Sequence, residues 1–222
     1  MIGTVHTDPL GRKTLEQALR QERPDVITVE ASELLVKYVI SGEHKDLSIR
    51  RLRRARQEGL SQLAFQNVSK QIRTIYNFEI EVSIKYAQQI RVPLVYVELP
   101  AVDKQEIYQL KEKLSKEVIA ELNYLVNHDS ENMDRSVKLY TDLELALVNK
   151  NFSQLIVNIN FDSDRDEFTA GKIRGLALRY GGAKLVHIGG GAHLLDDRKG
   201  RTLYERLKDL NPTRRTLRSY LK

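Results

Sequence analysis

The stretch IGTVH at Ile2–His6, followed by DVITVE at Asp25–Glu30, decides the fold class that we expect. Both runs are short, apolar and rich in β-branched residues, which is typical of buried strands. Between them, Thr14–Gln21 has the pattern of a helix, with Thr14 as its expected N-cap. A strand, a helix and a second strand in this order predict a βαβ unit with parallel strands.

Strand and helix patterns continue to alternate along the chain. Further strands are expected at Leu94–Leu99, Leu155–Asn160 and Lys184–Gly189. In the first half of the chain we expect a helix that is capped by Ser32 and runs through Ile40, and a mostly polar helical stretch from about Asp46 to Gln89. One long amphipathic helix is expected at Asp103–Val126, and a second helix from about Asn132 to Asn149. Near the end we expect a helix at Asp164–Tyr180 and short basic helices on both sides of Asn211-Pro212.

These patterns predict an α/β fold with a central, mostly parallel sheet. We expect a single domain over residues 1–222, because no low-complexity linker interrupts the chain. The strands divide into two α/β halves, and the helices at about residues 102–150 form an insertion between them.

The composition favours a soluble, cytoplasmic protein. No run of eighteen apolar residues is present, and Met1 leads directly into a strand pattern, so we expect neither a membrane segment nor a signal peptide. The chain has no cysteine, which excludes disulfides and thiolate metal sites. Histidine and carboxylate side chains are therefore the strong metal ligands that remain.

The net charge of +6 and the sequence pI near 9.4 raise the question of an anionic partner. Arginines cluster at Arg50–Arg56, and basic residues gather again at Arg214–Lys222. No aromatic residues interleave with the arginines of the first cluster, although binding of single-stranded nucleic acid needs such stacking platforms. We therefore expect a solvated or substrate-facing helix, and nucleic-acid binding is the weakest of the functional alternatives.

Two copies of Gly-x-x-His, at Gly3–His6 and Gly190–His193, stand where expected strands end. The carboxyl ends of parallel strands meet at one edge of a sheet, where α/β proteins bind ligands. His6 and His193 are therefore expected to share a site, and a metal ion is the ligand that we expect there. The alternative for each histidine is a hydrogen-bonded turn residue. Of the other histidines, His187 is expected inside its strand, as a reserve ligand, and His44 and His128 in loops.

Several segments resemble a known family in their order along the chain. These are Gly3–His6 with Glu22–Glu30, Glu79–Ala87, Leu94–Pro100, Arg165–Ile173 and Leu185–Leu194. Together they resemble the TraB and TIKI proteins, a group related to the erythromycin-esterase and ChaN-like superfamily. The chain departs from the usual pattern after Glu30, where Ala31, Ser32 and Lys37 replace an acidic residue followed by arginine, and at Leu99, which replaces the arginine of an acidic-Arg-Pro motif.

The resemblance implies a metal-dependent hydrolase, because TIKI proteins are regarded as peptidases that use a divalent cation such as manganese or cobalt. It implies His6, Glu30 and His193 as metal ligands. Imidazole and carboxylate ligands suit Mn, Co, Fe or Zn, and a bound cation lowers the pKa of water enough to make a nucleophile.

The resemblance also implies two catalytic residues. Glu79 is the expected general base or a further ligand, and the neighbouring Glu81 is the alternative for that role. Arg165 is expected to neutralise an oxyanion or a substrate carboxylate. The alternative for Arg165 is a local contact with Asp162 or Asp164 at the start of its own helix.

A second class of function stays open at this point. Relatives among the ChaN-like proteins bind haem, and TraB proteins have been viewed as regulators that bind a peptide signal. The alternative to a hydrolase of peptides or small molecules is therefore a non-enzymatic binder of a peptide or of haem. The oligomeric state is also open, a homo-oligomer included.

Overall fold

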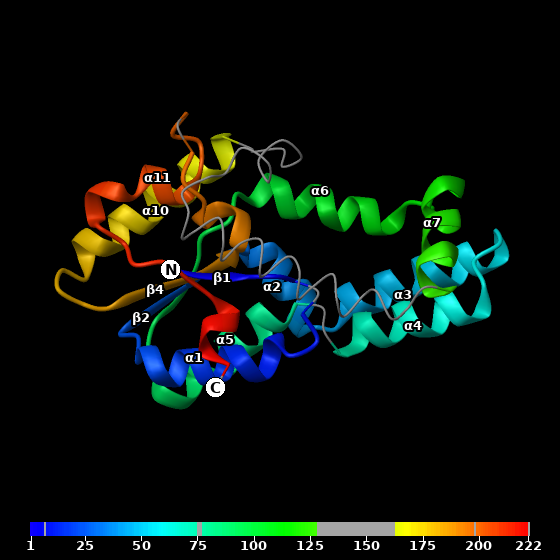
Figure 1. The fold of residues 1–222 in the computed structure, drawn as a ribbon, viewed down its shortest axis with the longest axis horizontal. Coiled ribbons are helices and arrows are strands. Elements are labelled where there is room, and N and C mark those ends of the chain that lie inside the picture. The colour runs from blue at the N-terminus through cyan, green and yellow to red at the C-terminus, as the bar shows by residue number, and fades with distance from the viewer. Residues whose placement is uncertain (7, 75–76, 128–162, 198, 222) are drawn as a thin grey trace.

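The computed structural model describes residues 1–6, 8–74, 77–127, 163–197 and 199–221. Five parallel strands form a sheet at the centre of this part of the chain (Figure 1). The strands are β1 (Ile2–Thr4), β2 (Val26–Val29), β3 (Leu94–Tyr96), β4 (Leu185–Gly190) and β5 (Arg215–Thr216). Their order across the sheet is β3-β2-β4-β1-β5, and every pair is parallel. The expected α/β fold with a parallel sheet is confirmed.

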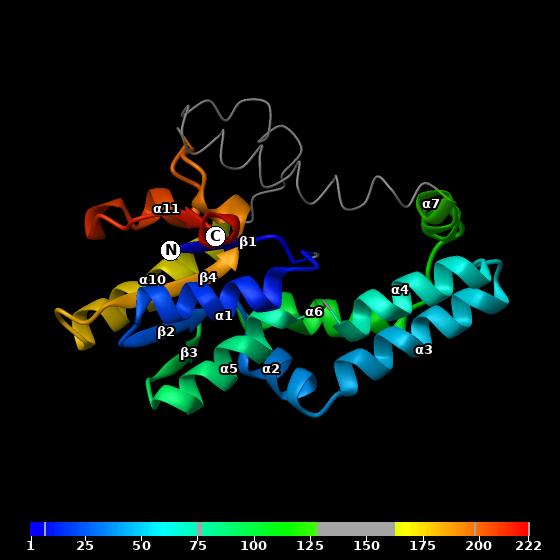
Figure 2. The same ribbon diagram turned by 60° about the horizontal axis from the view of Figure 1, so that its bottom comes forward.

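Helices cover both faces of this sheet (Figure 2). On one face lie α1 (Gly11–Glu22), α2 (Glu33–Ile40) and α5 (Phe78–Ile90), which share a hydrophobic core with residues such as Ile27 and Ile188. On the other face lie α10 (Ser163–Arg179) and α11 (Leu203–Arg206), which pack against residues such as Leu185. Successive strand residues alternate between the two cores, as a sheet buried on both faces requires.

A helical arm extends from one end of the sheet (Figure 1). It contains α3 (Glu43–Gln57), α4 (Gln62–Thr74), α6 (Pro100–Lys111) and α7 (Lys116–Asn127). A separate hydrophobic core, which includes Leu52, Leu60 and Ile119, holds α3, α4 and α7 together. In this arm Arg54 donates a hydrogen bond to the carbonyl of Lys111, and Arg56 donates one to the carbonyl of Leu60. Part of the arginine cluster therefore joins segments of the arm.

Two helix predictions are wrong in their boundaries. The segment Asp103–Val126 forms α6 and α7 and not one long helix, because the backbone becomes extended at Glu112. Apolar residues recur at the same helical spacing on both sides of this break, because each of the two helices has an apolar face that it buries. The first helix begins at Gly11, and Thr14 is not its N-cap: the Thr14 hydroxyl donates a hydrogen bond to the carbonyl of Leu10.

Some of the other predictions about the elements are confirmed, and some lie outside the described residues. The predicted strands Ile2–His6 and Leu94–Leu99 form but are shorter, at Ile2–Thr4 and Leu94–Tyr96. Ser32 caps α2 by accepting a hydrogen bond from the Leu35 N–H, and α10 forms where expected. The polar stretch from about Asp46 to Gln89 is divided among α3, α4 and α5. The strand β5 was not expected, because two residues are too few to show an alternating pattern. The predicted strand Leu155–Asn160, the helix from about Asn132 to Asn149, and His128 lie outside the described residues.

No helix in the described ranges combines the length and the apolar character needed to cross a membrane.

Candidate functional site

A crevice opens at the carboxyl ends of β1, β2 and β4. The connections that leave β1 and β2 run over the face covered by α1 and α5, whereas the connection that leaves β4 runs over the face covered by α10 and α11. Such a switch in direction separates the loops and leaves room for a ligand. A cavity of about 310 Å³ lies here, and its lining includes His6, Glu30, Glu79 and Arg165.

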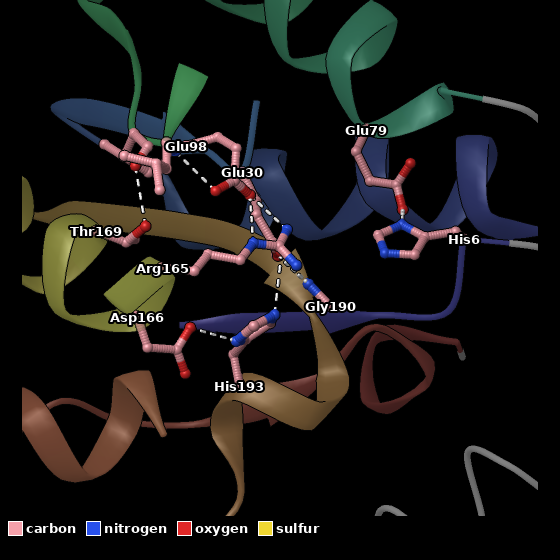
Figure 3. Close-up of polar contacts among 12 residues, drawn as sticks. His6, Glu30, Glu79, Glu98, Arg165, Asp166, Thr169, Gly190 and His193 are labelled. Atoms are coloured by element: carbon pink, nitrogen blue, oxygen red, sulfur yellow. Dashed lines mark hydrogen bonds and ion pairs between the residues drawn. The ribbon is translucent and has the colours of Figure 1, made fainter. Parts of the chain in front are cut away.

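Glu30 is at the centre of this site (Figure 3). It follows β2 directly, and only 8% of its side chain is exposed. One carboxylate oxygen accepts a hydrogen bond of 2.6 Å from the Gly190 N–H, and the other pairs with Arg165 and lies 3.0 Å from His193 Nε2. Burial alone would raise the pKa of Glu30, but the positive charges of His193 and Arg165 hold it well below its usual range. Glu30 is therefore an anion at neutral pH.

Arg165 joins Glu30 to a second buried carboxylate, that of Glu98. The Arg165 Nε donates a hydrogen bond of 2.7 Å to Glu98, whose side chain is 1% exposed. Thr169, one turn further along α10, donates a hydrogen bond to the carbonyl of Val97 and so fixes the helix against β3. Burial, together with the nearby charge of Glu30, raises the pKa of Glu98 despite the bond to Arg165. The guanidinium thus compensates two carboxylates that lie close together.

His193 lies between two carboxylates. It belongs to the short 3-10 helix Gly191–Leu194 after β4, and its Nδ1 lies 2.6 Å from an oxygen of Asp166, while its Nε2 faces Glu30. Burial lowers the pKa of His193, but the negative charges of Glu30 and Asp166 outweigh burial and raise the pKa to about 10. His193 is therefore an imidazolium at neutral pH when no other cation is bound.

The raised pKa of His193 predicts how stability depends on pH. Because the folded-state pKa of about 10 lies above the reference value of 6.5, the protonated ring stabilises the fold fully below about pH 6.5. This contribution is lost as the pH rises toward 10. We expect the free energy of unfolding of wild type to exceed that of His193→Gln at pH 7, and this difference to shrink between pH 7 and pH 10. Urea unfolding in the presence of EDTA measures it. An advantage that stays constant over this range would contradict the ion pairs with Glu30 and Asp166.

His6 approaches the same crevice from β1. Its Nδ1 lies 2.7 Å from Glu79 Oε1, and 63% of its side chain is exposed to the crevice and solvent. Glu79 lies in the first turn of α5 and is buried. Glu81 faces elsewhere and pairs with Arg12 and Lys45. Of the two glutamates considered for a catalytic role, only Glu79 contacts a predicted site residue.

Gly190 marks the point where the two Gly-x-x-His motifs and Glu30 converge. A Cβ added at Gly190 would lie 3.4 Å from His6 Nε2, 3.4 Å from His193 Cδ2 and 3.7 Å from Glu30 Oε2. The fold thus brings together three residues that are up to 187 positions apart in the sequence. Arg165 and Glu79 border the same cavity, so all five predicted site residues lie around one crevice.

These side chains do not form a ready-made metal centre. Within the described ranges, no three histidine, aspartate or glutamate side chains are placed to hold an ion as they stand. Both nitrogens of His193 face carboxylates, and Arg165 occupies an oxygen of Glu30. The donor types nevertheless suit a divalent cation, and His6 Nε2 and Glu30 Oε2 both border the open space beside Gly190. A bound cation would replace the proton on His193.

Two residues of the site were not predicted from the sequence, Glu98 and Asp166. Glu98 ends the strand segment before Pro100, and Asp166 directly follows Arg165. A carboxylate inside a buried segment requires a partner, which was the available signal for Glu98. His44 was expected in a loop, which is wrong: it is buried in α3, and its Nδ1 lies 3.1 Å from the side-chain nitrogen of Asn77.

No family model, curated protein or solved structure matches the chain.

Proposed function

We propose that this chain is a divalent-metal-dependent hydrolase of the TraB/TIKI type that cleaves a peptide bond with water. The observation that carries the proposal is the convergence of both Gly-x-x-His motifs on the Glu30 carboxylate beside Gly190. A structural role alone gives no reason for two histidines, an arginine and four carboxylates to gather at the switch point of a parallel sheet.

His6, Glu30 and His193 are the residues that would hold the cation. His193 Nε2 lies 3.0 Å from Glu30 Oε1, and His6 Nε2 and Glu30 Oε2 border the open space beside Gly190, so all three side chains would face a cation bound there. The carboxylates of Glu79 and Asp166, on the Nδ1 atoms of His6 and His193, are the partners that fix the orientation of histidine ligands. When bound, the cation would lower the pKa of a water molecule and polarise the substrate carbonyl.

The other residues supply proton transfer and charge. Water adds to the carbonyl carbon, and Glu79 takes the proton that this water loses and passes it to the leaving amine as the C–N bond breaks. Arg165 lines the cavity and is held by Glu30 and Glu98, so it is already in place to stabilise negative charge on the carbonyl oxygen.

The proposal is tested with Glu79→Gln. This variant keeps the size of the side chain and removes its basicity, so we expect it to fold and to retain metal, while cleavage of unstructured peptides falls about 100-fold or more. Cleavage is measured by mass spectrometry with Mn²⁺, Co²⁺ or Zn²⁺ added, and bound metal by elemental analysis.

The matched control is Glu81→Gln, two residues away on the same helix, which should keep full activity because Glu81 pairs with Arg12 and Lys45. His6→Ala and His193→Ala should both lose metal. Equal activity of Glu79→Gln and wild type would remove Glu79 from the mechanism. If wild type cleaves no peptide with any of the three cations, the hydrolase proposal fails, and a Soret band with haemin or saturable peptide binding would favour a non-enzymatic binder.

A further inference from the structure

A second cavity, of about 280 Å³, lies at the opposite end of the sheet from the candidate site. It is lined by Leu185, the first residue of β4, whereas the candidate site lies beyond Gly190, the last. Side chains of α10 and of the segment that follows α11 form its other walls, among them Ile173, Ala177 and Leu207. The two spaces are therefore separate.

The walls of this second cavity favour a neutral, apolar occupant. Aliphatic side chains form most of the lining, together with the rings of Tyr180 and His187, and none of the described lining side chains is an acid, a lysine or an arginine. Burial lowers the pKa of His187 to about 3, so its ring is neutral. Met1 also lines the cavity, and its amino group donates a hydrogen bond of 2.7 Å to the carbonyl of Thr213. Burial lowers the pKa of this amino group to about 6, so it is largely uncharged at pH 7. A charged ligand would therefore lose its hydration here without gaining a strong ionic partner.

The size of the cavity suits one small molecule. An apolar space of about 150 Å³ inside a protein binds benzene, since filling it restores dispersion contacts that its walls otherwise lack. The second cavity is larger than this, and Gly182 and Leu210 at its edge are exposed, which gives access from solvent.

His187 forms the wall between this cavity and the candidate site. It is 2% exposed, its Nδ1 shares a hydrogen bond with Thr28, and its Nε2 has no hydrogen-bond partner among the described residues. A Cβ added at Gly189 would lie 2.8 Å from His187 Nε2 and 2.5 Å from Glu30 Oε2. The His187 ring thus has the second cavity on one side and Glu30 on the other.

We infer that the second cavity is a binding site for a small, neutral, aromatic molecule of about the size of indole. Aromatic rings suit a space lined by aliphatic side chains and the rings of Tyr180 and His187. Binding requires neither a metal ion nor turnover, so it is measured independently of the hydrolase proposal.

The test is a titration of the whole chain with indole. Calorimetry measures the binding, and the NMR signals of the histidine rings show where indole binds. We expect one indole per chain and a shift of the His187 signals, while those of the equally buried His44 stay unchanged. Ala177→Phe fills the cavity and should weaken binding at least tenfold. Leu178→Phe, at the neighbouring position of α10 where the side chain is 85% exposed, should bind indole like wild type.

Ala183→Phe fills the cavity from the turn before β4 and serves as the second blocking variant if Ala177→Phe does not fold. The inferred site is wrong if indole shows no saturable binding. It is also wrong if the blocking variants bind as tightly as wild type, or if indole shifts the signals of His6 and His193 and leaves those of His187 in place.

Discussion

Arg165→Met should lower the free energy of unfolding by about 3–5 kcal/mol at neutral pH and abolish activity. The guanidinium compensates the negative charges of Glu30 and Glu98, two buried carboxylates that would repel each other without it. Urea unfolding measures the loss. Without Arg165, both carboxylates are expected to have raised pKa values, so the penalty is largest when they are ionised. The difference from wild type should therefore shrink as the pH falls from 7 to 4.

The control for this prediction is Arg174→Met in the same helix. Arg174 pairs with Asp209, whose side chain is largely exposed, and such a pair contributes about 1 kcal/mol or less. If Arg165→Met costs no more than Arg174→Met, the two buried carboxylates do not depend on Arg165.

Gly189→Ala should reduce activity by about 100-fold or more, because the added methyl group displaces Glu30. The new Cβ would lie 2.5 Å from Glu30 Oε2 and 2.8 Å from His187 Nε2, and neither atom can stay in place at these distances. Movement of Glu30 would break its bond to the Gly190 N–H and its contact with His193. Overpacking of this kind also costs about 1–3 kcal/mol of stability. Peptide cleavage and thermal unfolding measure the two effects.

Gly171→Ala is the matched control, since a Cβ at this helical position has no heavy atom within 4 Å. Alanine is favoured over glycine inside a helix by about 0.5–1 kcal/mol, so this variant should be more stable than wild type and equally active. Normal activity in Gly189→Ala would show that the position of Glu30 is not critical.

The sequence was sufficient to predict that His6, Glu30 and His193 lie at one edge of the sheet. Each follows a strand pattern, and parallel strands direct their carboxyl ends to the same side, so the strand order was not needed. The continuous apolar spacing of Asp103–Val126 was misleading, because two helices that bury their faces against different neighbours retain the same period.

The pairing of charges was beyond sequence analysis, because it depends on how each helix is rotated against the sheet. Asp164 and Asp166 both lie in the first turn of α10, and only the rotation of the helix directs Asp166 toward His193. In the same way, residues two positions apart on a helix point to different sides. Glu79 therefore contacts His6, whereas Glu81 contacts Arg12.

The strand order also determines when the site can form during synthesis. β4 lies between β1 and β2, although it is made about 155 residues after β2. Until β4 has left the ribosome, no strand links β1 to β2, because β4 pairs with both. Glu30 then has neither Gly190 nor His193 beside it. A nascent chain that contains His6, Glu30 and Glu79 but not yet β4 therefore lacks the completed crevice.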